Sequence, residues 1–274
     1  QADPDTKVIL LVSKPPAPEM ARMVMDQVAK SSKPTVVCLL GGDTRSVEAP
    51  KHVHVVNTLE EAGLLAARLA GAKIPEPKEL IARETEEIKT LAKSLKPKLK
   101  AEQKYLRGLF SGGTLCYESQ VIWRDEFEIE VTSNAPLDKK FQMKDSLKSE
   151  KNCCVDLGEE EFTVGRPHPM IDNDLRVRRL LSEGKDPAVA VILLDVVIGY
   201  GAHPDPAAEL GDAIRKAQAA AKAEGREIIF VASVTGTEGD PQNLTRTTQT
   251  LKAAGVHVCN SNAAASRLSA LLVA

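Results

Sequence analysis

The chain has 274 residues, of which 43% are hydrophobic and 27% are charged, a globular composition with enough length for two ordinary domains. The formal net charge is −2 and there is no basic tract, which argues against nucleic acid or an anionic membrane as a partner. No apolar stretch approaches the length of a membrane span, and the longest run, 188–199, is interrupted by Asp195.

The cysteines also bound the class of protein. The five cysteines have no metal-ligand spacing, so the sequence predicts no metal site. An odd count that includes the adjacent pair Cys153 and Cys154 is not typical of a disulfide framework. With no signal-peptide pattern, we expect a cytoplasmic protein. Because the chain starts with Gln1 a few residues before a strand, we expect a fragment or a processed chain.

Residues 1–74 predict a partial flavodoxin-like module. Short apolar strands alternate with amphipathic helices, the pattern of a parallel sheet. The expected strands are 7–12, 35–40 and 52–56, and the expected helices are 18–30 and 59–70. Three strands make a thin domain, so we expect its first β–α units to be missing upstream.

Residues 75–103 predict a charged helical linker. The segment is rich in Lys and Glu and is bracketed by prolines, and its apolar residues have helical spacing over 79–95. This pattern favours a solvated linking helix over a functional arm.

Residues 104–274 predict a second flavodoxin-like module. The expected strands are 105–110, 154–157, 188–197, 227–234 and 256–259. The expected helices begin at Thr114 and at 172, 206, 241 and 262. Residues 124–151 are polar and irregular, which predicts a surface excursion. The fold class is therefore α/β, with two parallel-sheet modules of which the first is incomplete.

Unusual residues gather at one end of the second predicted sheet. Ligands of open parallel sheets bind outside the carboxyl ends of the strands. The loops expected there are 111–114, 165–170, 195–206, 235–242 and 260–262, and they hold most of the Gly, His and polar residues. The loops at the opposite end read as plain helix stops. This difference predicts a site at the carboxyl edge.

The turn Ser111-Gly112-Gly113-Thr114 has two interpretations. It ends a strand and begins a helix, so the free N–H groups of the helix start can bind an anion such as a phosphate. Its glycines allow the anion to approach the backbone closely. Alternatively, the turn is only a tight connection in which Ser111 or Thr114 caps the helix.

The loop 165–170, which reads Gly-Arg-Pro-His-Pro-Met, supplies the candidate catalytic residues. Arg166 suits a phosphate or carboxylate, and the flanking prolines hold His168 in an extended conformation. His168 can then transfer a proton or donate a hydrogen bond to an acyl oxygen. The alternative is a rigid loop whose histidine caps a neighbouring carbonyl.

Other residues of the same edge are candidates for lining a pocket. They are Asp195, Gly199, Gly201, His203, Gly236 and Thr237. We expect Asp205 to cap the helix that begins at Pro206, and Asp240 with Pro241 to start the following helix.

Several strings together resemble one known family, the FdrA proteins. They are 12–16, 107–118, 164–170, 194–203 and 240–242, and the resemblance covers nearly the whole chain except 124–151. FdrA proteins are similar to the NDP-forming acyl-CoA synthetases, with succinyl-CoA synthetase as the prototype. In that superfamily, paired ligase modules each direct a helix N-terminus at a shared phosphate site. By this resemblance, Gly112, Gly113 and Thr114 would start one such helix.

The resemblance also limits what this chain does alone. The Gly-His-Ala-Gly loop that carries the phosphohistidine of the ligases is not in the sequence, and neither is a recognisable CoA-binding or ATP-grasp domain. The cofactors are therefore unknown, and CoA or a nucleotide is expected only in the complete assembly, with other subunits or as a homo-oligomer.

The resemblance implies a subunit that binds a small acyl phosphate. The reaction is then either a CoA-ligase-like acyl or phosphoryl transfer, or carbamoyl transfer between oxamate and carbamoyl phosphate in allantoin catabolism. Arg166 and His168 would hold or protonate the transferred group. The alternative function, from another class, is a non-catalytic scaffold or ligand-sensing module that keeps the ligase fold.

Overall fold

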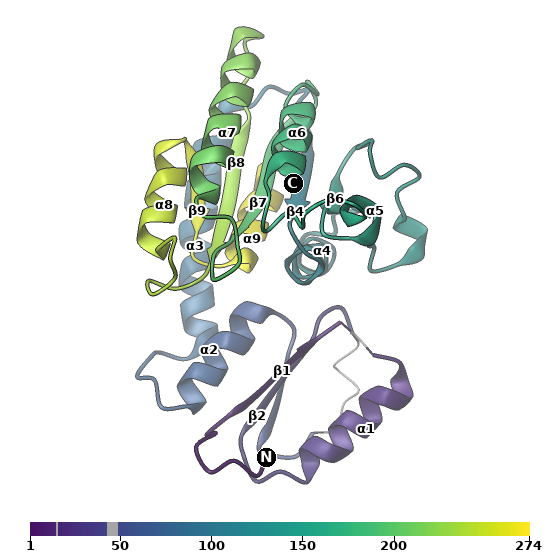
Figure 1. Cartoon of the computed structure of the whole chain (residues 1–274), viewed down its shortest axis with the longest axis vertical. Coiled ribbons are helices and arrows are strands. Elements are labelled where there is room, and N and C mark those ends of the chain that lie inside the picture. The colour runs from purple at the N-terminus through teal and green to yellow at the C-terminus, as the bar shows by residue number, and fades with distance from the viewer. Residues whose placement is uncertain (15, 43–48) are drawn as a thin grey trace. The chain divides into compact units, whose positions relative to one another are not determined.

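The computed structural model describes residues 1–14, 16–42 and 49–274. The chain forms two compact units, 1–86 and 87–274, and each contains a parallel sheet with flanking helices (Figure 1). Both parallel sheets confirm the predicted α/β fold class. Pro15, in the string 12–16, lies outside the described residues.

The first unit has a three-stranded sheet in the order β1-β2-β3. Its strands are β1 (Ile9–Ser13), β2 (Thr35–Leu39) and β3 (Val53–Val56), and its helices are α1 (Pro18–Ala29) and α2 (Leu59–Leu69). These elements match the predicted ones, with boundaries shifted by a residue or two. A small core between α1 and the sheet contains Val28, Val37 and Val53.

Helix α3 (Pro77–Leu95) contains the boundary between the two units and leads into a short 3-10 turn, Lys96–Lys98. The sequence pattern favours a solvated linking helix here. Its second half instead contributes Ile88, Ala92 and Leu95 to a core of the second unit, each no more than 6% exposed. This half of α3 is therefore an integral part of that unit.

The second unit has a six-stranded parallel sheet in the order β5-β6-β4-β7-β8-β9. Its strands are β4 (Tyr105–Phe110), β5 (Thr132–Ser133), β6 (Cys153–Asp156), β7 (Val189–Val197), β8 (Ile229–Thr235) and β9 (Val256–Cys259). Without β5, the order β6-β4-β7-β8-β9 is the 2-1-3-4-5 order of flavodoxin-like folds. The short edge strand β5 was not predicted.

Helices cover both faces of this sheet, as Figure 1 shows with α6 and α7 in front of the strands. They are α4 (Gly113–Phe127), α5 (Glu160–Thr163), α6 (Asp174–Glu183), α7 (Pro206–Ala223), α8 (Leu244–Ala253) and α9 (Asn262–Val273). One core packs α6, α7 and α8 against the sheet, and another packs α4 and α9 against the opposite face. In the part of the chain that the structure describes, no helix is long and apolar enough to cross a membrane.

Two helix boundaries differ from prediction for identifiable reasons. Helix α8 was expected to begin at Pro241, but the Asp240 carboxylate accepts a hydrogen bond from Thr237 instead of capping the helix. The helix begins after Asn243, whose side chain accepts from the backbone N–H of Arg246. Helix α4 runs on to Phe127, into the segment expected to be irregular. Its C-cap is Glu128 in a left-handed conformation (φ 56°), a conformation that sequence reasoning rarely assigns to a glutamate.

Candidate functional site

The start of α4 lies at the point where the helices change faces of the sheet. Strands β4 and β7 are neighbours, yet α4 and α7 follow them on opposite faces. Gly112 is the N-cap residue in an extended conformation, and among the described residues no side chain caps the helix. Neither Ser111 nor Thr114 therefore performs the capping role that was the alternative interpretation. The first turn also lacks an acidic residue, so no carboxylate of this turn opposes the positive end of the helix dipole.

Asp195 holds the residue that precedes this helix start. Its carboxylate accepts hydrogen bonds from the backbone N–H of Ser111 at 2.8 Å and from the Ser111 hydroxyl at 2.6 Å. Arg176 from α6 donates to the same carboxylate at 3.0 Å, and also to the Asp195 backbone carbonyl. All three residues are buried, and the lost solvation lowers the pKa of Arg176 while Asp195 opposes that shift. These contacts hold the ends of β4 and β7 together, and both oxygens of the Asp195 carboxylate accept hydrogen bonds in them.

His168 lies beside the same turn. Its Nδ1 atom accepts from the backbone N–H of Met170 at 3.2 Å, which leaves the proton on Nε2. A Cβ atom added to Gly158 would lie 2.8 Å from that Nε2 atom and 2.6 Å from the carbonyl oxygen of Ser111. The imidazole therefore lies against the carboxyl ends of β4 and β6, with a donor beside the turn. The sequence pattern alone does not single out Gly158, although a glycine allows other groups to approach the backbone closely.

Arg166 lies only two positions before His168 but occupies another surface. It lines a shallow hollow of about 240 Å³ together with Leu157, Phe162 and Arg178. Its side chain is exposed and makes no hydrogen bond or ion pair with the described residues. The structure thus brings His168 to the α4 turn, and it places Arg166 in a neighbouring hollow formed with α5 and α6.

The loop after β7 is held by Gln242, which lies in the motif 240–242 but has no role assigned from the sequence. Its buried side chain accepts from the backbone N–H of Gly199 at 3.1 Å and donates to the carbonyls of Gly199 and His203, both at 3.0 Å. Positive φ angles at Gly199 (150°) and Gly201 (81°) allow the chain to turn between these contacts. No local sequence pattern could reveal these contacts, because Gln242 and Gly199 are 43 residues apart in the sequence.

His203 connects this loop to the loop that carries His168. The His203 backbone N–H donates to the Met170 carbonyl at 2.7 Å. Its ring accepts from the Asp205 backbone N–H at 3.1 Å and lies 3.3 Å from Glu209. Asp205 caps α7, as predicted, by accepting from the Ala208 backbone N–H. His203 thus supports the loop, and Asp205 starts the helix.

Gly236 and Thr237 form a closed turn at the same edge. The carboxylate of Asp240 accepts from both the backbone N–H and the hydroxyl of Thr237, at 2.5 and 3.1 Å. A Cβ on Gly236 would lie 2.1 Å from the side chain of Ile198, so the glycine is needed for close packing. Both contacts account for these residues without a ligand.

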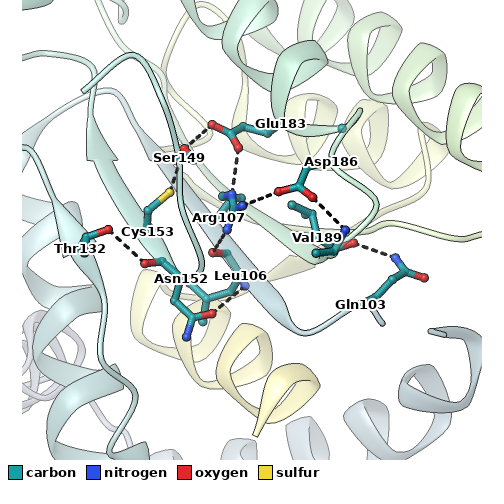
Figure 2. Close-up of polar contacts among 12 residues, drawn as sticks. Gln103, Leu106, Arg107, Thr132, Ser149, Asn152, Cys153, Glu183, Asp186 and Val189 are labelled. Atoms are coloured by element: carbon teal, nitrogen blue, oxygen red, sulfur yellow. Dashed lines mark hydrogen bonds and ion pairs between the residues drawn. The ribbon is translucent and has the colours of Figure 1, made fainter. Parts of the chain in front are cut away.

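A second buried ionic group lies away from this edge (Figure 2). Arg107 of β4 donates to Glu183 at 2.9 Å and to Asp186 at 2.7 Å. Arg179 of α6 also donates to Glu183, at 2.6 Å. Cys153 lies beside the group, and its thiol donates a hydrogen bond to the Ser149 hydroxyl at 3.1 Å. Burial, the largest cause, raises the pKa of Cys153 to about 11, so its thiol is neutral at pH 7. We call Arg107, Arg179, Glu183 and Asp186 the Arg107 cluster.

Two further cysteines meet in the core behind the α4 turn. The sulfur atoms of Cys116 and Cys154 lie 3.2 Å apart, and both residues are fully buried. The pKa of Cys154 is raised, first by burial and then by its contact with Cys116. Among the described residues, no group of three or more His, Cys, Asp or Glu side chains is arranged to hold a metal ion.

The fold and the open helix start at the switch point are those of one protein class. The CoA-ligase family model matches residues 109–272, more than half of the chain, so the chain belongs to the CoA-ligase family and is related to succinyl-CoA synthetase-like proteins. It is also 40% identical over 264 residues to the uncharacterized protein YahF of Escherichia coli K12. The match covers 95% of this chain and 49% of YahF, so the chain spans about half the length of that relative.

Proposed function

We propose that the second unit binds the phosphate group of a small acyl phosphate at the N-terminus of α4, as an FdrA-type subunit that takes part in acyl or phosphoryl transfer. The observation that carries the proposal is the uncapped start of α4 at the switch point of a CoA-ligase family unit. The N–H groups of Gly113 and Thr114 and the helix dipole would hold the phosphate oxygens. Asp195 would keep Ser111 and the turn in place from behind.

In this proposal His168 acts on the acyl group. Its Nε2 proton lies beside the turn and can be donated to an acyl oxygen while charge builds on that oxygen. The side chain of Arg166 is exposed and has no partner among the described residues, so it can turn towards a bound anion. Carbamoyl phosphate and the acyl phosphate of a CoA-ligase reaction share the phosphate group that this site would bind, so the proposal covers both reactions.

The second candidate is a non-catalytic scaffold or ligand-sensing module. The specific observation in its favour is that Asp195, His203 and Thr237 are all used in contacts that support loops. In that case His168 would cap the backbone N–H of Met170 and do nothing more.

Calorimetric titration with inorganic phosphate, carbamoyl phosphate and CoA tests the proposal. The variant Thr114→Asp places a negative charge in the first turn of α4, and Thr114→Asn is its uncharged, nearly isosteric control. We expect saturable phosphate or carbamoyl phosphate binding that weakens by about tenfold or more in the Asp variant and little in the Asn variant.

The ligand that binds assigns the reaction. Carbamoyl phosphate binding without CoA binding, reduced by His168→Gln or Arg166→Ala, would favour carbamoyl transfer. CoA binding without carbamoyl phosphate binding would favour the ligase reaction. Binding of none of the three ligands would contradict the proposal and favour the scaffold.

A further inference from the structure

The two units contain a structural repeat. The strands β1-β2-β3 of the first unit correspond in order and direction to β7-β8-β9 of the second. Ile-Leu-Leu occurs at 9–11 in β1 and at 192–194 in β7. The register of the strands agrees as well. In the first unit His54 lies opposite Val36, and Val36 lies opposite Leu10. In the second unit His257 lies opposite Val231, and Val231 lies opposite Leu193. Leu10 is therefore the equivalent of Leu193.

The helices that follow the third strands extend the repeat. The sequence Val-His-Val-Val-Asn-Thr at 53–58 corresponds to Val-His-Val-Cys-Asn-Ser at 256–261. Thr58 caps α2 by accepting from the backbone N–H three residues ahead, and Ser261 caps α9 in the same way. Counting from these caps, Gly63 of α2 is the equivalent of Ser266 of α9.

In the second unit, these positions are covered by β4 and α4. Strand β4 pairs with the edge of β7 that β8 leaves free, and Leu193 is fully buried. Helix α4 packs along α9, where the hydroxyls of Ser119 and Ser266 are 2.7 Å apart and the Trp123 ring nitrogen donates to the Ser266 carbonyl at 2.9 Å. One β–α unit thus covers both the strand edge and the flank of the helix.

In the first unit, the same positions are open. Within the described residues β1 pairs only with β2, and Leu10 and Val12 are 43% and 42% exposed. Both lie on the face opposite Leu11, which packs with the α1 core. A Cβ atom added to Gly63 would meet no atom within 4 Å among the described residues, apart from its chain neighbours and the backbone of its own helix. We call Leu10, Val12 and Gly63 the β1–α2 face.

We propose that the β1–α2 face binds a β–α unit, consisting of a strand that pairs parallel to β1 and a following helix that packs against α2. Apolar side chains at an unpaired strand edge are otherwise an aggregation hazard, which natural sheets avoid. The proposed source is the part of YahF-type proteins outside the matched region, which is about half of YahF. A second copy is a poorer occupant, because its β4 and α4 are already packed in their own sheet. This inference is independent of the proposed phosphate site.

The test co-expresses this chain with the unmatched part of Escherichia coli YahF as a separate, tagged polypeptide. We expect a stoichiometric complex in which hydrogen exchange of the β1 amides is slowed by about tenfold or more. The double variant Leu10→Lys/Val12→Lys should abolish the complex. The matched control Met20→Lys/Met23→Lys alters exposed apolar residues of α1, and it should keep the complex.

A second variant tests the β1–α2 face without altering strand β1, so that loss of the complex cannot be attributed to damage of the sheet. Gly63→Gln fills the open space on α2 without touching β1 and should also weaken the complex. Absence of a complex, or a complex with unchanged exchange in β1, would overturn the proposal. Concentration-dependent dimers of this chain alone, lost in the Leu10→Lys/Val12→Lys variant, would overturn it in favour of a second copy.

Discussion

The second unit contains two buried ionic groups that differ in what they leave open. The Arg107 cluster lies within the fold, and its cations are matched by carboxylates of the same chain. The group of Ser111, Arg176 and Asp195 is equally buried but supports a helix start with free N–H groups. Burial and charge alone therefore do not mark a binding site. The proposed anion site therefore rests on the uncapped helix start beside the buried network, and not on burial or charge.

The largest expected effect is the loss of stability in Arg107→Ala. Removal of the guanidinium leaves Glu183 buried with one partner fewer, at a cost of about 3–5 kcal/mol in the free energy of unfolding. Urea unfolding followed by the fluorescence of Trp123, the single tryptophan, reports on this unit. The control Arg124→Ala removes an exposed pair with Asp125 and should cost no more than about 1 kcal/mol. Equal losses of unfolding free energy in the two variants would contradict the structural role of the Arg107 cluster. Reduced phosphate binding in folded Arg107→Ala would contradict its separation from the proposed site.

Asp195→Asn should change both stability and binding. The neutral amide cannot accept from Ser111 and Arg176 as the carboxylate does, which should cost about 2–3 kcal/mol of unfolding free energy and displace the α4 turn. Ser233→Ala is a control at the register partner of Asp195, because the buried Ser233 hydroxyl has no hydrogen-bond partner in the described part of the chain. That variant should be neutral or stabilising. Unchanged phosphate affinity in folded Asp195→Asn, measured by calorimetry, would separate Asp195 from the site.

Gly158→Ala should displace His168 from the turn. The added methyl group would lie 2.6 Å from the Ser111 carbonyl oxygen, so the backbone or the imidazole must shift, at about 1–3 kcal/mol of unfolding free energy. Carbamoyl phosphate binding should weaken, and the NMR signals of the His168 ring should change. Gly239→Ala, where a Cβ meets only the Thr237 hydroxyl at 3.7 Å, is the control. Unaltered His168 signals in Gly158→Ala would contradict this packing.

At neutral pH the smallest effect is that of Cys153, beside the Arg107 cluster, because its contribution to stability is lost only at alkaline pH. Its folded pKa of about 11 exceeds the ordinary value of 9.0, so the folded state keeps a proton that the unfolded state loses. The stability that the thiol contributes is complete below pH 9 and is lost between pH 9 and 11, by about 1.4 kcal/mol per pH unit. Urea unfolding at several pH values should show a shallower decline in Cys153→Ala than in the parent chain. Parallel declines would show that Cys153 does not carry this pH dependence.

The sequence predicted the local parts of this structure well. Strands such as β4 and β9 and the helix α7 follow from apolar runs and from ordinary caps, which are local signals. The predicted start of α8 was wrong because Asp240-Pro241 resembles a helix start in sequence. In the structure the Asp240 carboxylate accepts a hydrogen bond from Thr237 instead. The Asp240 carboxylate had two possible local roles, and it accepts from Thr237, three residues earlier, instead of starting the helix.

The site residues were only partly accessible to the same reasoning. The edge with its glycines and histidines was recognisable because parallel strands end together. The contacts of Arg176 with Asp195 and of Gln242 with Gly199 join residues distant in the sequence, so spacing could not reveal them. The direction of a side chain is equally invisible, as the separation of Arg166 from His168 shows.

The most direct test of the central claim is a titration of the ¹⁵N-labelled chain with inorganic phosphate, followed by NMR of the backbone amides. The amide signals of Gly113 and Thr114 should shift saturably, because their N–H groups would bond to the phosphate oxygens. Signals of the Arg107 cluster should stay in place. Phosphate that leaves Gly113 and Thr114 unmoved, or that shifts only residues elsewhere, would contradict the proposal that the start of α4 is the anion site.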